Sequence, residues 1–153
     1  MKKRVITYGT FDMFHIGHLK LLQRLSELGD ELIVAVSTDE FNGIKNKTVL
    51  IPYEQRAEIV NNIKCVDKVI PEVSWDQKIS DIRKYDIFLF AIGDDWEGEF
   101  DYLKEHCKVQ YLSRTKDIST TQLKKSLTNF LSISKEDILG VFKVIAALKK
   151  DFE

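Results

Sequence analysis

Short apolar segments alternate with helical patterns along most of this chain. ELIVAVS at residues 31–37 and DIFLFAI at 86–92 are continuous apolar runs, typical of strands that are buried on both faces. Between such runs the apolar residues recur at helical spacing, as Leu19, Leu22 and Leu25 do. Strands that alternate with helices predict right-handed crossovers, and therefore a parallel sheet covered on both faces.

The whole pattern predicts an α/β fold: a Rossmann-like, doubly wound, five-stranded parallel sheet with helices on both faces, plus a C-terminal helix. Residues 38–51 are polar and contain lysines, which predicts a loop. The strands are expected at residues 4–8, 31–37, 68–70, 86–92 and 108–112, and helices are expected to begin near residues 17, 52, 76, 99 and 119.

Polar or glycine-bearing segments follow four of these predicted strands. Because doubly wound sheets bind ligands at the carboxyl ends of their strands, these segments are the first candidates for a site. They lie at residues 9–10, 37–38, 93–95 and 113–115.

We expect residues 1–131 to form one domain and residues 132–153 to form a C-terminal helical extension. Ser134 is a candidate helix cap, and apolar residues follow it at helical spacing. This spacing predicts a helix that packs on the domain or on a neighbouring subunit. A membrane-surface helix is the alternative, although the segment is short and only mildly basic.

Charge and composition argue against several classes of function. The formal net charge of −1 argues against a long nucleic-acid surface, which needs a basic excess. No apolar stretch reaches the roughly 18 residues of a membrane span, so we expect no stable membrane insertion. Cys65 and Cys107 form no CxxC pair and have no histidine cluster at metal spacing, so we expect no metal held by the protein. Sparse cysteines also suit a reducing cytoplasm.

Two of the three histidines lie close together on a predicted strand–loop–helix junction. His15 and His18 are separated by Ile16 and Gly17. Gly17 allows a phosphate to approach closely, and the N-terminus of the following helix favours an anion. Both imidazoles can donate hydrogen bonds to phosphate oxygens, and phosphoryl-type transfer depends mainly on such positioning and charge stabilisation.

The segment around these histidines, GTFDMFHIGH, resembles the signature of the HxGH nucleotidyltransferases, which attack the α-phosphate of a nucleotide and release pyrophosphate. Over residues 2–130 the chain more specifically resembles the glycerol-3-phosphate cytidylyltransferases. One departure is Asp117, which stands where that family has a glycine. The further segments that carry the resemblance are STDEF at 37–41, Lys45 with Lys47, YEQR at 53–56, VDKVIPE at 66–72, GDDWEG at 93–98 and RTKDISTT at 114–121.

The resemblance implies a role for each matching residue. His15, His18, Lys47 and Arg114 would stabilise the reacting phosphates, and Lys45 and Lys78 would bind glycerol phosphate. The residues implied to bind CTP are Thr10, Phe11, His15, His18, Lys47, Arg56, Asp95, Arg114, Thr115, Ile118, Ser119, Thr120 and Thr121.

The same resemblance implies transfer of CMP from CTP to sn-glycerol 3-phosphate, giving CDP-glycerol for teichoic acid or a related surface polymer. It further implies Mg²⁺ bound mainly through the CTP phosphates, a homodimer and a cytoplasmic enzyme. One alternative is a sibling enzyme that uses phosphoethanolamine or phosphocholine. A choline pocket would need an aromatic cage, and the sequence shows no such cluster. The other alternative is a catalytically silent nucleotide-binding module.

Several candidates also have a purely structural interpretation. Lys78 alone is typical of solvated surface, and Arg56 is typical of a helix-surface salt bridge with Glu58 or a neighbour. Trp75 and Trp96 are typical of packing residues. Asp12 could orient its loop by accepting backbone hydrogen bonds, and Asp94 and Asp95 could cap a turn.

Overall fold

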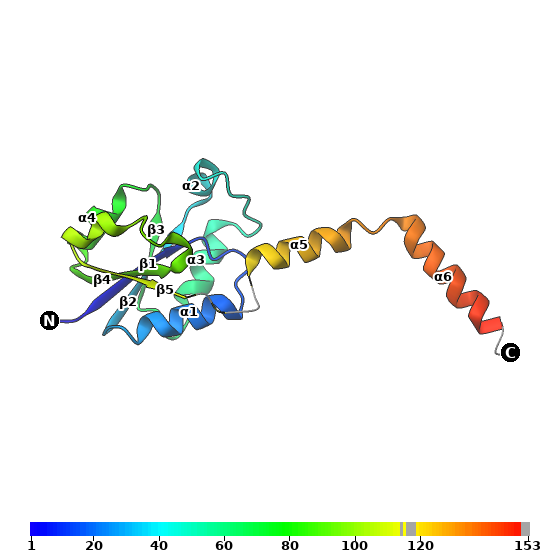
Figure 1. Ribbon diagram of the computed structural model, residues 1–153, viewed down its shortest axis with the longest axis horizontal. Helices are drawn as coiled ribbons and strands as arrows, with labels where there is room; N and C mark the ends of the chain where they lie inside the picture. The colour runs from blue at the N-terminus through cyan, green and yellow to red at the C-terminus, as the bar shows by residue number, and fades with distance from the viewer. Residues whose placement is uncertain (114, 116–118, 151–153) are drawn as a thin grey trace. The chain divides into compact units, whose positions relative to one another are not determined.

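The computed structural model describes residues 1–113, 115 and 119–150. It divides into two units, Met1–Ile118 and Ser119–Glu153. The first unit contains a five-stranded, all-parallel sheet with the strand order β3-β2-β1-β4-β5, which confirms the predicted α/β fold (Figure 1). The strands are β1 (Arg4–Gly9), β2 (Glu31–Ser37), β3 (Lys68–Glu72), β4 (Ile87–Gly93) and β5 (Lys108–Leu112).

Successive residues of each strand point to opposite faces, and each face carries its own apolar core. Val5 packs with side chains of α1 (Ile16–Ser26) and α3 (Tyr53–Asn61). Its neighbour Ile6 packs with α4 (Gln77–Lys84) and the short 3₁₀ segment η2 (Asp101–Glu105) on the other face. Helices therefore cover both faces, as the continuous apolar strands predict (Figure 1).

The turn before β2 requires a glycine for lack of space. A Cβ on Gly29 would lie 2.4 Å from the carbonyl oxygen of Lys3. The same carbonyl accepts a 2.8 Å hydrogen bond from the N–H of Asp30, so the turn is fixed against the start of β1. The first helix ends earlier, at Ser26 with Glu27 as its C-cap, and Gly29 allows the close approach to β1 from which β2 begins.

The prediction of a continuous loop over residues 38–51 is wrong, because a short helix, α2 (Asp39–Ile44), begins it. The Thr38 hydroxyl caps this helix by accepting a 3.2 Å hydrogen bond from the Phe41 N–H. The acidic Asp39 in the first turn suits the helix dipole, and the Phe41 ring is buried. A cap and one buried ring are enough to hold this helix in a polar segment.

The strand order creates a switch point beside β1. The chain passes from β1 to β2 and β3 on one side of the sheet and then returns to place β4 and β5 on the other side. Connections therefore leave β1 and β4 in opposite directions, which opens a crevice at their carboxyl ends. Two of the sequence candidates lie at these strand ends. Gly9 is the last residue of β1, and Asp95 lies in the turn after β4.

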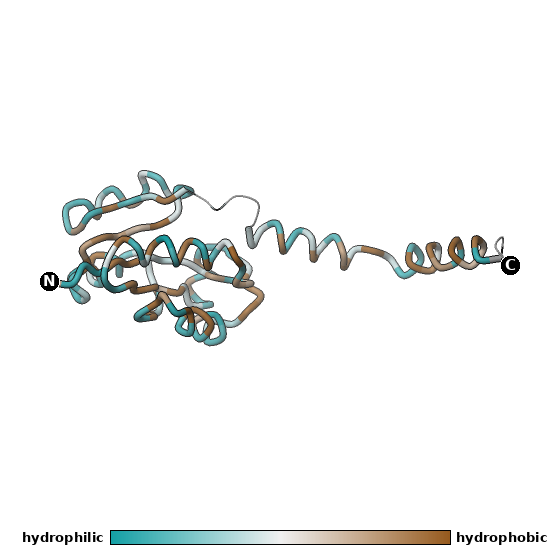
Figure 2. Tube along the Cα trace, turned by 90° about the horizontal axis from the view of Figure 1, so that it is seen from below, coloured by the Kyte–Doolittle hydropathy of each residue, from teal (hydrophilic) through white to brown (hydrophobic). Residues whose placement is uncertain are grey.

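The second unit consists of α5 (Thr120–Leu131) and α6 (Lys135–Lys150). The Ser134 hydroxyl accepts a 3.0 Å hydrogen bond from the Asp137 N–H, which confirms its predicted capping role. The apolar side chains of α6, including Phe142, are exposed. Much of this helix is coloured as hydrophobic in Figure 2. The expected division at residue 131 stays a prediction.

No helix within residues 1–113, 115 and 119–150 combines the length and the apolar character needed to cross a membrane.

Candidate active site

The two histidines cap the helix that follows β1. His15 is the N-cap of α1, and its Nδ1 accepts a 3.0 Å hydrogen bond from the Gly17 N–H. The Nδ1 of His18 in turn accepts a 3.3 Å hydrogen bond from the His15 N–H. An accepting Nδ1 fixes the tautomer, because the ring proton of a neutral imidazole must then be on Nε2. Each ring can therefore offer an Nε2–H donor to a phosphate oxygen.

Burial keeps both rings neutral at pH 7. It lowers the pKa of His18 to about 4, with a smaller contribution from the neighbouring His15. Burial also lowers the pKa of His15. The rings stack with their centroids 4.0 Å apart, a contact that two imidazolium ions would oppose by like-charge repulsion. A neutral pair can offer hydrogen-bond donors to a phosphate but no positive charge.

Two aromatic residues orient His18. The ring of Phe11 meets it edge-on, with centroids 5.4 Å apart, and the ring of Phe14 lies at the same distance. Phe11 and Met13 both adopt positive φ, of 52° and 51°, so the chain turns sharply between β1 and α1. The Phe11 ring is buried in the core, and its implied contact with CTP stays a prediction.

Asp12 fixes the lysine-bearing segment beside this turn. Its two carboxylate oxygens accept hydrogen bonds from the N–H groups of Leu50 and Ile51, each 3.0 Å long. The structural interpretation of Asp12, as an acceptor of backbone hydrogen bonds, is confirmed. The histidine turn and the segment that carries Lys45 and Lys47 are thus joined at residue 12.

Arg56 makes a second connection from the first turns of α3. Its side chain is 1% exposed and donates to the carbonyls of Thr10, at 2.5 Å, and Ile51, at 2.7 Å. It also donates to the Asp39 carboxylate, at 2.6 Å. The alternative of a helix-surface salt bridge with Glu58 is wrong, because the guanidinium points inward. Arg56 ties three chain segments together at the site, and its implied contact with CTP stays a prediction.

Three of the predicted lysines converge on one cavity. Lys45, Lys47 and Lys78 line a space of about 50 Å³ at the switch point between β1 and β4. The other lining residues are Tyr8, Gly9, Thr10, Glu72, Trp75, Ile92, Trp96 and Phe100. Among the lining groups, three ammonium groups against one carboxylate leave a positive charge suited to a phosphate dianion.

Glu72, at the end of β3, holds two of these lysines. Its carboxylate is 2% exposed, lies 2.9 Å from the Lys78 ammonium and 3.4 Å from that of Lys45. It also accepts a hydrogen bond from the Ser37 hydroxyl. Lys78 is itself only 1% exposed, so the interpretation of this residue as solvated surface is wrong. Glu72 was not among the predicted site residues, because only the fold brings it to the lysines.

Aromatic rings surround the lysine ammonium groups. The Lys78 nitrogen lies 4.5 Å from the ring centroid of Tyr8, 5.0 Å from that of Trp75 and 5.3 Å from that of Phe100. The Lys45 nitrogen lies 4.3 Å from the Phe41 centroid. The fold therefore gathers an aromatic cluster that the sequence alone does not show. Trp75, considered a packing residue, lines the cavity, and so does Trp96.

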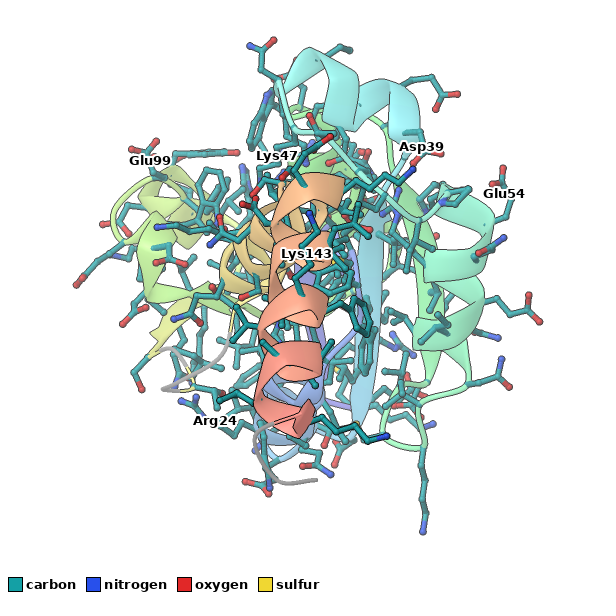
Figure 3. All side chains as sticks on the ribbon, turned by 90° about the vertical axis from the view of Figure 1, so that its right-hand side faces the viewer. Arg24, Asp39, Lys47, Glu54, Glu99 and Lys143 are labelled. Carbon is teal, nitrogen blue, oxygen red and sulfur yellow. The ribbon has the colours of Figure 1, made fainter. Side chains whose placement is uncertain are left out.

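The remaining predicted residues are placed as follows. Lys47 is exposed, lies 5.5 Å from the Trp96 ring centroid and also lines a second cavity of about 310 Å³ together with Asp39. Figure 3 shows Asp39 and Lys47 close to α2, with Arg24 at the opposite end of the first unit. Asp95 is exposed in the 3₁₀ turn η1 (Asp94–Trp96) after β4.

The predicted nucleotide loop is described only in part. Arg114, Asp117 and Ile118 lie outside the described residues, and Thr115 is half-buried. Ser119 caps α5 in the second unit, where its hydroxyl accepts a 3.1 Å hydrogen bond from the Gln122 N–H. Thr120 and Thr121 form the first turn of that helix. The implied CTP-binding roles of this loop stay predictions.

Comparison with known proteins shows the family to which this chain belongs. The family model described as Cytidylyltransferase-like matches residues 6–129. The chain belongs to this family. Among its relatives is a glycerol-3-phosphate cytidylyltransferase of Bacillus spizizenii, 60% identical over 83% of this chain and 98% of the relative. The protein of the same name from Staphylococcus aureus is 57% identical over 82% of this chain and 95% of the relative.

A solved structure supports the fold. The lipopolysaccharide core biosynthesis protein from Thermoplasma volcanium superposes with a TM-score of 0.65, over 76% of this chain and 100% of that chain, at 23% identity. At this identity the likeness concerns the fold, and it confirms the Rossmann-like arrangement of the first unit. The family model and the relatives of 57–60% identity identify this chain as a nucleotidyltransferase.

Proposed function

We propose that this chain transfers the cytidylyl group of CTP to sn-glycerol 3-phosphate, giving CDP-glycerol and pyrophosphate. The observation that carries the proposal is a cavity with three lysines that adjoins the turn leading to two neutral histidine donors. Relatives named for this activity, which align over at least 95% of their own length at 57–60% identity, support it.

The site separates two phosphate-binding tasks. The lysine cavity has the charge to hold the phosphate of the acceptor, whereas the Nε2–H donors of His15 and His18 suit the phosphates of the nucleotide. Thr10 lines the cavity and is five residues from His15, so their Cα atoms are at most about 18 Å apart. The same short turn after β1 therefore connects the lysine cavity with the histidine donors.

The reaction is a direct in-line transfer. An oxygen of the acceptor phosphate forms a bond to the α-phosphorus of CTP, while the bond from that phosphorus to the bridging oxygen of pyrophosphate breaks. The acceptor phosphate is already an anion at neutral pH, so the step needs no general base. His15 and His18 donate hydrogen bonds to the charge that develops, and Lys47 supports it electrostatically.

We propose that Mg²⁺ accompanies CTP and is held mainly by its phosphates and by water. Within the part of the chain that the structure describes, no three His, Cys, Asp or Glu side chains are grouped so as to hold a metal ion. The carboxylates closest to the site have other partners, since Asp12 binds backbone N–H groups and Glu72 binds lysines. We therefore assign no protein ligand to the ion. Bound to CTP, it would neutralise the leaving pyrophosphate.

We further propose a cytoplasmic homodimer that supplies CDP-glycerol for teichoic acid or a related surface polymer. The resemblance of residues 2–130 to the glycerol-3-phosphate cytidylyltransferases supports this context, because activated glycerol phosphate is consumed in building such polymers. Sedimentation of the purified chain tests the dimer independently of the activity.

A pyrophosphate-release assay tests the activity. CTP and ATP are each combined with glycerol 3-phosphate, phosphoethanolamine or phosphocholine. We expect release with CTP and glycerol 3-phosphate, and a loss of turnover by orders of magnitude in His15→Ala and in His18→Ala with the fold intact by circular dichroism. Preference for another acceptor would establish a sibling activity, and no release with any pair would favour a silent nucleotide-binding module.

A further inference from the structure

The ammonium group of Lys78 lies in a site that is built like a receptor for organic cations. We use the term cation cage for the rings of Tyr8, Trp75 and Phe100 together with the carboxylate of Glu72. The Lys78 nitrogen lies 4.5–5.3 Å from the three ring centroids and 2.9 Å from the carboxylate. Aromatic faces combined with an anion are the arrangement by which proteins bind substrate ammonium groups.

The Lys78 ammonium occupies the cation cage, and the cage forms part of the wall of the proposed acceptor cavity. Lys78 is 1% exposed, yet it belongs to the wall of the cavity that also contains Lys45 and Lys47. An acceptor in that cavity therefore meets an ammonium group of the protein at the place where its own ammonium would otherwise bind. Like charges at such short range make this place unfavourable for a second cation.

We propose that Lys78 determines acceptor specificity, because it occupies the cation cage and so excludes phosphorylated alcohols that carry an ammonium group. The proposal rests on the function proposed above and extends it to the choice of acceptor. Glycerol 3-phosphate carries no ammonium that would compete for the cage, and its oxygens can accept hydrogen bonds from the Lys78 ammonium that lines the cavity. Phosphoethanolamine, with a phosphate for Lys45 and Lys47 and a compact ammonium, is the acceptor that an empty cage would admit.

Lys78→Ala empties the cage and makes the proposal testable. We measure pyrophosphate release from CTP with glycerol 3-phosphate and with phosphoethanolamine, and compare the two values of kcat/KM. In Lys78→Ala the preference for glycerol 3-phosphate should fall at least about tenfold, since a desolvated cage provides a cation with that much binding. An unchanged preference in the folded variant overturns the proposal.

A small amine should restore the activity that Lys78→Ala loses. Lys78→Ala deletes three methylenes and the ammonium, which together correspond to n-propylammonium. Propylammonium chloride should raise the activity of Lys78→Ala with glycerol 3-phosphate several-fold, whereas n-propanol of the same size, or sodium chloride at the same ionic strength, should not.

The matched control is Lys84→Ala, on the same helix, where an exposed lysine lies 5.1 Å from the Tyr85 ring centroid. Equal effects of the amine and the alcohol contradict a cation site.

Two further measurements keep the test decisive. Lys78→Met fills the cage with an apolar chain of similar length, so it should lose activity with glycerol 3-phosphate and not respond to propylammonium. Wild-type efficiency in Lys78→Met overturns the proposal even if Lys78→Ala does not fold. Thermal unfolding of Lys78→Ala with propylammonium requires no activity, so it tests the cage separately. If the wild-type chain is inactive with every acceptor, only the proposed function fails.

Discussion

Replacing Arg56 by methionine should destabilise the protein strongly, because its guanidinium holds three chain segments. The substitution keeps most of the apolar stem and removes the bonds to the carbonyls of Thr10 and Ile51 and to the Asp39 carboxylate. A hydrogen bond to a charged group contributes about 1.5–3 kcal/mol, so the two bonds to carbonyls account for roughly 3–6 kcal/mol. Asp39 is 46% exposed, and solvent screening makes its share small. The expected loss is a large part of the usual stability of a small domain.

Urea unfolding followed by circular dichroism measures this loss. The midpoint for Arg56→Met should fall well below that of the wild type, whereas Arg83→Met, an exposed arginine on α4, should change the free energy of unfolding by less than about 0.5 kcal/mol. Below the midpoint, Arg56→Met should also show a raised KM for CTP, since both the histidine turn and the lysine segment lose an anchor. A loss of less than about 1 kcal/mol would refute the reasoning, because it would mean that the two carbonyls find other donors at no cost.

Three other substitutions test separate parts of the site. His18 has a pKa of about 4 when folded and takes up a proton near pH 6.5 when unfolded, so stability should fall by about 3 kcal/mol between pH 6.5 and 4; urea titrations should show this slope flattened in His18→Gln. Asp12→Ala removes the acceptor of two backbone N–H groups, so amide hydrogen exchange at Leu50 and Ile51 should accelerate while the rest of the sheet is unchanged. Glu72→Gln should raise the KM for glycerol 3-phosphate at least about tenfold and leave the KM for CTP near its wild-type value, with partial recovery in Glu72→Asp.

The sheet was predictable because strands buried on both faces must be apolar throughout. The strands at residues 31–37 and 108–112 were predicted at their observed bounds, and the other three to within two residues at either end. The sequence predicts helix ends less well than strands, because single capping side chains and single buried rings determine where a helix begins and ends. Thr38 and Phe41 make α2 in a segment whose polar composition indicates a loop.

The residues proposed to bind phosphate were predictable to different degrees for a physical reason. His15 and His18 are three residues apart, so their association is a local property that spacing reveals. Even so, their reciprocal capping of α1 was not anticipated, because histidine is an unusual cap. The cluster of Glu72 with Lys78 and the Tyr8 ring joins three separate elements. Only the fold brings such residues together, and no periodicity in the sequence predicts their association.

The contrast between neutral histidines and fixed lysines suits a reaction between two anions. The acceptor and the nucleotide repel each other, so the protein must supply positive charge where the acceptor binds. Glu72 and the rings already hold Lys45 and Lys78 in place, so much of their side-chain entropy is lost on folding and little remains to be lost on binding. Burial meanwhile lowers the pKa of His15 and of His18, and an uncharged donor gains most where charge develops during the reaction. We therefore expect binding of the ground state to depend mainly on the lysines, and stabilisation of the transition state to depend on the histidine pair.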